Sequence, residues 1–192
     1  MPPKPRFTRE EIADAALDIV SRQGIEALTA RELGEALGSS ARPIFTVFRS
    51  MEELQQEVRS AAMRRFESYA GRTMPGVPLF KQVGMQRVLF GAQEPKLYQL
   101  LFMRENRSAV SFDDVFGELG DTAERCIEAV CRDYDLSPAQ ARVLFKHVWI
   151  YTFGVGALCA TRVCRFSEEQ LGRMLSTEFQ AMMLLVKSGG QS

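Results

Sequence analysis

Five helix-start signatures constrain the fold of this chain more than any other feature. Each is a Ser or Thr followed three residues later by Glu or Gln, the capping-box pattern in which two side chains satisfy free backbone N–H groups at a helix N-terminus. The signatures begin at Thr8, Thr29, Ser50, Ser137 and Ser167. Strand signals are nearly absent, because no stretch alternates apolar and polar residues between turn dipeptides. The sequence therefore predicts an all-α fold.

The caps, together with the Gly and Pro residues that end helices, predict about nine helices. We expect them at 8–23, 29–37, 41–48, 50–69, 79–92, 95–105, 113–134, 137–163 and 167–187. The stretch from Gly71 to Pro78 contains Pro75 and Gly76, residues typical of turns. It is the expected break between two domains, 1–70 and 71–192.

Composition excludes several classes of protein. The 24 Lys and Arg residues balance the 24 Asp and Glu residues, so any contact with a polyanion depends on local placement of charge. The first residues have no apolar signal-peptide core, and the longest uncharged apolar stretch, Val148 to Ala160, is short for a bilayer. We expect a cytoplasmic protein without a membrane segment. Its cysteines have no CxxC spacing, and we expect inert thiols at Cys126, Cys131, Cys159 and Cys164.

The segment from Leu28 to Leu54 has the size of a helix-turn-helix, with Gly38 in the turn. Apolar residues for a small core recur along it, at Leu28, Leu33, Leu37, Ile44, Phe48 and Leu54. Between Gly38 and Ser50 the only charged side chains are Arg42 and Arg49. This placement of positive charge is typical of a surface that faces phosphates.

Residues 6–70 resemble the DNA-binding domain of the tetracycline-repressor (TetR) family. The resemblance rests on Gly24 after the first helix, Thr29 at the start of the second, "GSSARPIFTVF" and "FRSMEEL". It extends more loosely to "EPKLYQLLF" and "HVWIYTFG". A TetR-like chain has an N-terminal three-helix helix-turn-helix domain, followed by a helical domain for ligand binding and dimerisation.

The resemblance implies which residues meet DNA. The residues expected at base edges in the major groove are Ala41, Arg42, Pro43, Thr46 and Val47, and those expected at the backbone are Thr29, Arg31, Phe45 and Arg49. Arg42 can bond to guanine O6 and N7, and a helix N-terminus such as that at Thr29 offers N–H groups to a phosphate. The chain departs from the family at Phe45, usually Tyr, at Val47, often His, and at Met51, usually Lys, so two phosphate contacts are lost. Lys4 and Arg6 are candidates to replace them.

The second half is rich in large, adaptable apolar residues that can line a ligand cavity. The residues expected to line it are Met85, Phe102, Phe112, Phe116, Trp149 and Phe153. In the family, the last two helices pair with their copies in a second subunit. Small residues on 137–163, such as Gly154, Gly156 and Ala160, and the apolar stripe of 167–187 fit that role. The resemblance thus implies a homodimer on a palindromic operator, released by a small apolar or amphipathic effector.

Three other functions remain as alternatives. A helical enzyme is disfavoured, because the chain has no nucleophile elbow, no phosphate-binding glycine loop, no metal-ligand set and one histidine, His147. We expect no cofactor, no metal and no catalytic residue. A helical small-molecule-binding or protein-interaction module with weak or lost DNA binding is the second alternative. Activation in place of repression is the third, and sequence does not separate the two.

Overall fold

The computed structural model describes residues 6–72, 74–105, 111, 112, 114 and 121–189. Within them it is all-helical, as predicted. The α-helices are α1 (Arg9–Gln23), α2 (Ala30–Ala36), α3 (Met51–Ala70), α4 (Leu79–Gln93), α5 (Pro95–Phe102), α7 (Asp121–Tyr134), α8 (Pro138–Ala160) and α9 (Glu168–Lys187). Short 3-10 turns occupy Ile25–Ala27 and Ile44–Thr46.

All five predicted caps begin a helix. Reciprocal capping boxes, in which both side chains bond to the backbone, form at Thr8, Ser137 and Ser167. At Thr29 and Ser50 the hydroxyl accepts from the backbone N–H three residues on. The acidic partner of Ser50, Glu53, is instead engaged by α1 and by the preceding turn.

The predicted helix at 41–48 is wrong in type, because only the three residues of the Ile44–Thr46 turn are helical and the turn is of the 3-10 kind. Pro43 has no N–H to donate, and the β-branched residues that follow it disfavour the α-helix. The Thr46 hydroxyl also donates to the Pro43 carbonyl at 2.6 Å, which stabilises the tight turn. Smaller differences are that α5 ends at Phe102, that α8 ends at Ala160 and that α7 is described from Asp121.

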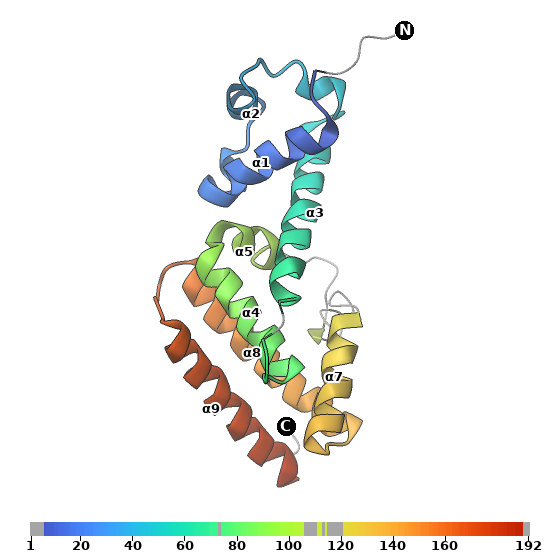
Figure 1. The fold of residues 1–192 in the computed structure, drawn as a ribbon, viewed down its shortest axis with the longest axis vertical. Helices are drawn as coiled ribbons and strands as arrows, with labels where there is room; N and C mark the ends of the chain where they lie inside the picture. Colours follow the sequence, from blue (N-terminus) through green and yellow to red (C-terminus); the bar gives the residue numbers. More distant parts are fainter. Residues whose placement is uncertain (1–5, 73, 106–110, 113, 115–120, 190–192) are drawn as a thin grey trace.

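The molecule is elongated, with α1, α2 and the 44–46 turn at one end and α3 descending from them towards the remaining helices (Figure 1). One buried cluster joins the two parts: Leu33 and Val58 of the first share it with Phe90 and Tyr98 of α4 and α5. Two further clusters fill the space among α4, α7, α8 and α9. The N-terminal helices are thus packed directly on α5 and α4.

Helices α4 and α8 make the most extensive helix contact in the described chain and cross closely at two glycines. A Cβ on Gly91 would lie 2.8 Å from the carbonyl oxygen of Gly156, and a Cβ on Gly156 would lie 2.7 Å from Cζ of Tyr98. Gly156 and Ala160 are buried inside the chain, so their small size allows α4 and α5 to pack closely against α8. The expectation that these two residues admit a second subunit is therefore wrong.

Helix α8 is 23 residues long, longer than the apolar stretch seen in the sequence, and by length and composition alone it could cross a membrane. In the structure it packs against α4, α5, α7 and α9, and 44% of its most apolar window is buried. These contacts make α8 the central helix of the second half.

Candidate functional site

The helix-turn-helix is held in place by a clamp between α1 and α3. Arg9 on α1 donates to Glu53 at 2.9 Å and to Glu57 at 3.3 Å, and its guanidinium lies 4.3 Å from the ring centroid of Phe48. Glu53 also accepts from the backbone N–H of Arg49 at 2.7 Å. The bond from Arg49 is the main cause that holds the pKa of Glu53 below its ordinary value, and the hydrogen bond from Arg9 is the second. The clamp fixes the turn that precedes α3 relative to α1.

A close approach inside the helix-turn-helix fixes the turn after α2. Gly34 is buried, and a Cβ there would lie 2.9 Å from the backbone carbonyl carbon of Ser40. The backbone N–H of Ser39 donates to the Gly34 carbonyl at 2.8 Å. The segment that carries residues 41–47 therefore rests directly on the backbone of α2.

The structure presents most of the predicted DNA-binding residues to solvent. The exposed ones are Thr29, Arg31, Arg42, Phe45, Thr46 and Arg49, and the half-buried ones are Ala41, Pro43 and Val47. Phe45 is 47% exposed, which is unusual for a large apolar ring. Ala41 and Val47 pack partly against the core of the helix-turn-helix, so they have less surface to offer than their neighbours.

Several of these side chains already have partners. Thr29 caps α2, and the Thr46 hydroxyl bonds to Pro43. Arg31 pairs with Glu35 at 2.9 Å, in a bridge so exposed that it is worth about 0–1 kcal/mol and is easily exchanged for a phosphate. Arg42 forms no ion pair with any residue that the structure describes. It is the cation on the exposed turn that is most available to DNA.

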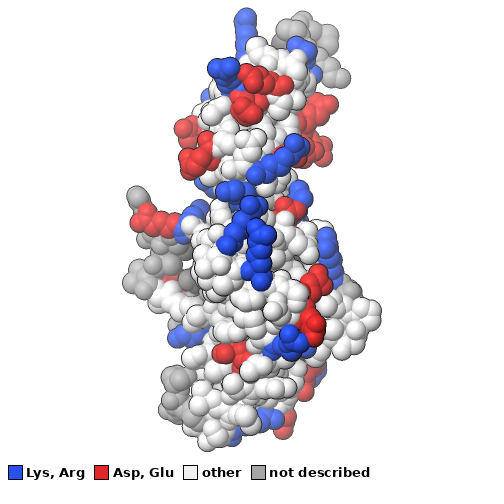
Figure 2. Space-filling view, turned by 90° about the vertical axis from the view of Figure 1, so that its left-hand side faces the viewer, with Lys and Arg blue, Asp and Glu red and all other residues white. Residues whose placement is uncertain are grey.

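The N-terminal arm adds one more cation beside this turn. Arg6 donates to the Ser39 hydroxyl at 3.2 Å and remains exposed, whereas Lys4 lies outside the described residues. On the face shown in Figure 2, Lys and Arg intermingle with Asp and Glu around the upper, N-terminal end. On this face the N-terminal end therefore carries charges of both signs.

Four of the six predicted ligand residues come together in the second half, around a residue that sequence reasoning missed. The guanidinium of Arg87, on α4, lies 4.9 Å from the ring centroid of Phe102, 4.3 Å from Trp149 and 5.7 Å from Phe153. Phe112 meets Trp149 edge-on at 5.3 Å. Arg87 is seven residues after Phe80 and so shares its helix face. This spacing in an apolar helix was the available signal for a buried arginine.

The other two predicted ligand residues are not in this cluster. Met85 packs on a different side of α4. It lies against a buried cluster of residues from α4, α8 and α9 that includes Val88, Leu171 and Leu175. Phe116 lies outside the described residues. We refer below to Arg87, Phe102, Phe112, Trp149 and Phe153 as the Arg87 cluster.

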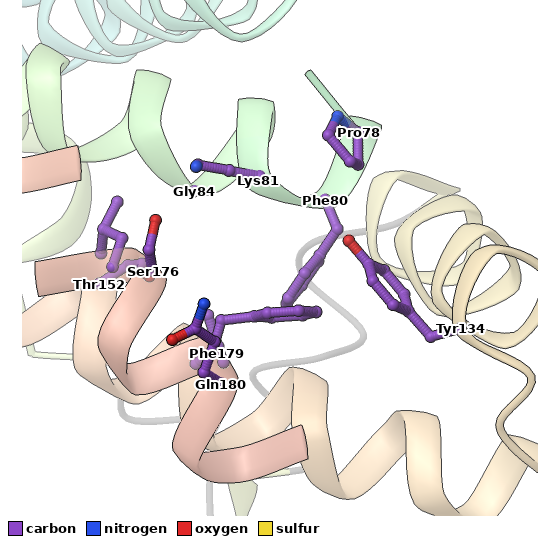
Figure 3. A pocket seen from close by; sticks show the side chains of 11 residues that line it. Pro78, Phe80, Lys81, Gly84, Tyr134, Thr152, Ser176, Phe179 and Gln180 are labelled. Atoms are coloured by element: carbon purple, nitrogen blue, oxygen red, sulfur yellow. The ribbon is translucent and has the colours of Figure 1, made fainter. Parts of the chain in front are cut away.

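A separate cavity of about 410 Å³ opens among α4, α7, α8 and α9 (Figure 3). The rings of Phe80, Tyr134 and Phe179 converge at one end of it, and Thr152 and Ser176 lie at the other. Its volume is within the range of small-molecule sites. None of the six predicted ligand residues lines it.

The cysteines are free thiols, and the two most buried are poor nucleophiles. Burial raises the pKa of Cys126 to about 11 and also raises the pKa of Cys159. Because the thiolate is the reactive form, both thiols are protonated and unreactive at neutral pH. Among the described residues no group of three His, Cys, Asp or Glu side chains is arranged to hold a metal.

Comparison with known proteins identifies the N-terminal domain. Residues 12–58, which span α1, α2, the 44–46 turn and the start of α3, match the model of bacterial regulatory proteins of the tetR family. The N-terminal domain is therefore similar to the DNA-binding domain of TetR-family regulators. A TetR-family regulator acts through DNA, and this chain is accordingly a DNA-binding transcriptional regulator with a helix-turn-helix.

Solved structures share the fold over almost the whole chain. A TetR-family protein from Vibrio parahaemolyticus has a TM-score of 0.60 and 17% identity, covering 90% of this chain and 97% of that one. A TetR-like transcriptional regulator from Rhodococcus has a TM-score of 0.57 and 16% identity, covering 93% and 97%. A TetR variant from Acinetobacter baumannii, in complex with minocycline, has a TM-score of 0.54 and 16% identity, covering 95% and 96%. A comparison with curated protein sequences finds no significant match.

Proposed function

We propose that this chain is a repressor that binds a palindromic operator as a homodimer and is released by a small apolar or amphipathic effector. The observation that carries the proposal is the exposed turn at 41–46. There Arg42 and Phe45 stand out from a rigid frame, and no described residue forms an ion pair with Arg42. Residues 1–70 act as the DNA-reading domain and residues 71–192 as the sensing and pairing domain. Thr29, Arg31 and Arg49 approach the DNA backbone, and Arg42 and Thr46 the bases.

An exposed apolar surface on the last two helices supports the homodimer. Helix α9 buries Leu171, Leu175, Met182 and Val186 against its own chain, so this stripe is not free for a partner. Its opposite side leaves Leu184 75% exposed. Other large apolar side chains exposed on α8, α9 and the loop between them are Ile150, Leu158, Val163 and Leu185. A surface of this kind is typical of a subunit interface.

The homodimer is tested by placing a charge on that surface. We expect Leu184→Glu to weaken self-association at least about tenfold, because the charge must be desolvated to pair the subunits. Sedimentation velocity over a concentration series measures the effect. Met63→Glu, at an exposed methionine on α3, is the matched control and should leave association unchanged. A wild-type chain that is monomeric at every concentration would contradict the proposal.

The effector site is proposed at the Arg87 cluster because its rings connect to the DNA-reading domain. Phe102 on α5 contacts Phe66 on α3 at 5.0 Å and Tyr98 at 5.0 Å. Helix α3 begins at Met51, shortly after the exposed turn, and α5 also packs on α1. A ligand that moves Phe102 therefore displaces the frame that sets the position of Arg42. Through linkage, effector and operator then oppose each other.

Selection from a random duplex DNA library tests the function as a whole. We expect a two-fold-symmetric consensus, because a dimer presents two copies of the turn. Its affinity should fall linearly with salt on a double-logarithmic plot, with a shallower slope than a protein with more phosphate contacts, since Met51 carries no charge. Absence of any enriched sequence would favour the alternative, a helical small-molecule-binding or protein-interaction module that has lost DNA recognition.

A further inference from the structure

Arg87 is a buried cation that has no carboxylate partner among the described residues. It is 6% exposed, and its Nε has no hydrogen-bond partner. Among the Asp and Glu side chains that the structure describes, none pairs with it, and Tyr98, through electrostatic attraction and a side-chain hydrogen bond, is the one titratable group that favours the charged form of Arg87. The phenol of Tyr98 donates its own proton to the Phe153 carbonyl at 3.1 Å. A neutral phenol therefore stands where a buried arginine usually has a carboxylate.

The surroundings of Arg87 supply only part of the stabilisation that a buried charge needs. Three ring faces attract the guanidinium, and such attractions are individually weak. Burial lowers the pKa of Arg87, which reports the unfavourable removal of its charge from water. Beside it, the indole Nε1 of Trp149 is a second buried donor without a partner. Buried polar groups without partners are rare in proteins, and each calls for an explanation such as a functional role or a bound water or ion.

Together these groups have the chemistry of a site for an organic anion. We propose that Arg87 binds the carboxylate of the effector, that Trp149 Nε1 donates a second hydrogen bond to it, and that the rings of the Arg87 cluster cover its apolar body. Arginine is suited to this, because its planar guanidinium bonds to both oxygens of a carboxylate. The inference rests on the proposed effector site and narrows the effector to an apolar carboxylate.

Matched pairs of small molecules test the charge requirement. The probes are phenylacetate, 4-phenylbutyrate and decanoate, each compared with its neutral primary amide. Trp149 is the only tryptophan of the chain, so its fluorescence reports on the cluster itself. We expect at least one carboxylate to change that emission and raise the melting temperature, and its amide to do neither. A set in which no carboxylate acts, or in which the amides act equally, would overturn the proposal.

Substitutions then locate the site. Arg87→Met should weaken carboxylate binding at least about tenfold, since a charge-assisted bidentate contact is lost. Without ligand, its melting temperature should not fall, because the substitution removes a buried charge that lacks a counter-ion. A clear fall would make Arg87 a structural cation held by the rings. Trp149→Phe keeps a ring and removes the free N–H, and should weaken binding several-fold by calorimetry.

A control at the second cavity separates the two places. Ser176→Phe fills the cavity among α4, α7, α8 and α9, which no residue of the Arg87 cluster lines, and should leave carboxylate binding unchanged. Loss of binding in Ser176→Phe but not in Arg87→Met would overturn the assignment to Arg87. The proposed function has a separate test. If a carboxylate binds through Arg87 but operator affinity is unchanged, the effector role is contradicted and the anion site stands.

Discussion

Gly156→Ala is expected to lower the free energy of unfolding by about 2–4 kcal/mol, although alanine is the better helix former. The added Cβ would lie 2.7 Å from Cζ of Tyr98, a ring with no exposed surface. Helix α8 is fixed by α4 on the same side, where Gly91 meets the Gly156 backbone, so it cannot retreat to make room. Tyr98 must move instead.

The movement of Tyr98 sets the size of the effect. Its hydroxyl loses the bond to the Phe153 carbonyl, and its ring packs against Phe102 at 5.0 Å, so the strain reaches α5. Overpacking costs about 1–3 kcal/mol, a buried hydrogen-bonding group left unpaired costs about 1–3 kcal/mol, and alanine returns up to about 1 kcal/mol of helix propensity. Urea unfolding at equal protein concentration, followed by circular dichroism, measures the difference.

Gly172→Ala is the matched control, in the interior of α9. A Cβ at Gly172 would lie 3.8 Å from Met85 Cε, an ordinary contact. We expect this variant to be as stable as the wild type or more stable by up to about 1 kcal/mol. If Gly156→Ala were equally harmless, the close crossing of α4 and α8 would not be a feature of the protein in solution.

The arrangement of helices follows from local sequence signals, whereas the side on which each helix packs depends on its neighbours. Caps such as Thr8 and Ser167 act within one turn of the chain, so they placed helix starts correctly. The prediction of a helix at 41–48 was wrong because Pro43 and the β-branched residues after it favour a tighter turn than the apolar spacing suggests. Short segments are where such local conflicts decide the outcome.

The prediction that small residues on α8 face a second subunit was wrong for a related reason. Gly154 and Gly156 are two positions apart, yet one faces solvent and the other is buried against Tyr98. Sequence shows that a glycine permits a close approach but not which helix makes it. The same limit applies to α9, whose regular apolar stripe covers its own core and whose less regular Leu184 and Leu185 are exposed.

The two candidate sites differ in how far sequence could reach them. The exposed turn is continuous in the chain, so family resemblance points to consecutive residues such as Arg42 and Thr46. The Arg87 cluster is assembled from α4, α5 and α8 and from Phe112, and no spacing rule connects those segments. The aromatic content of the second half led us to place its four rings in one site. The position of Arg87 among them is visible only in the packed structure.

Arg42→Ala is expected to weaken binding to the selected operator by about 1–3 kcal/mol per half-site, or about 5–150-fold for each copy of the turn. A homodimer carries two copies, so on a symmetric operator the two losses add. The physical reason is that Arg42 is the exposed turn's available cation, on a frame that the Arg9 clamp and Gly34 hold rigid. Its removal takes away hydrogen bonds to base edges and leaves the frame unchanged.

Specificity and salt dependence distinguish base reading from phosphate contact. If Arg42 reads a base, repeating the selection with Arg42→Ala should give a consensus with relaxed preference at one position of each half-site. If it only contacts phosphate, affinity should fall on all sequences alike, and the salt slope should drop by about one for each copy. Fluorescence anisotropy on the consensus and on single-base variants measures both.

The matched control removes an arginine at the far end of α1. Arg22 pairs with Asp18 in the last turn of that helix, and Gly24, just after the helix, lies beside Lys96 of α5. Arg22→Ala changes the net charge by the same amount as Arg42→Ala, so any long-range electrostatic effect is shared. Equal losses in the two variants would mean that DNA responds to overall charge and would contradict a specific role for Arg42. A loss confined to Arg42→Ala would place the reading contact on the exposed turn.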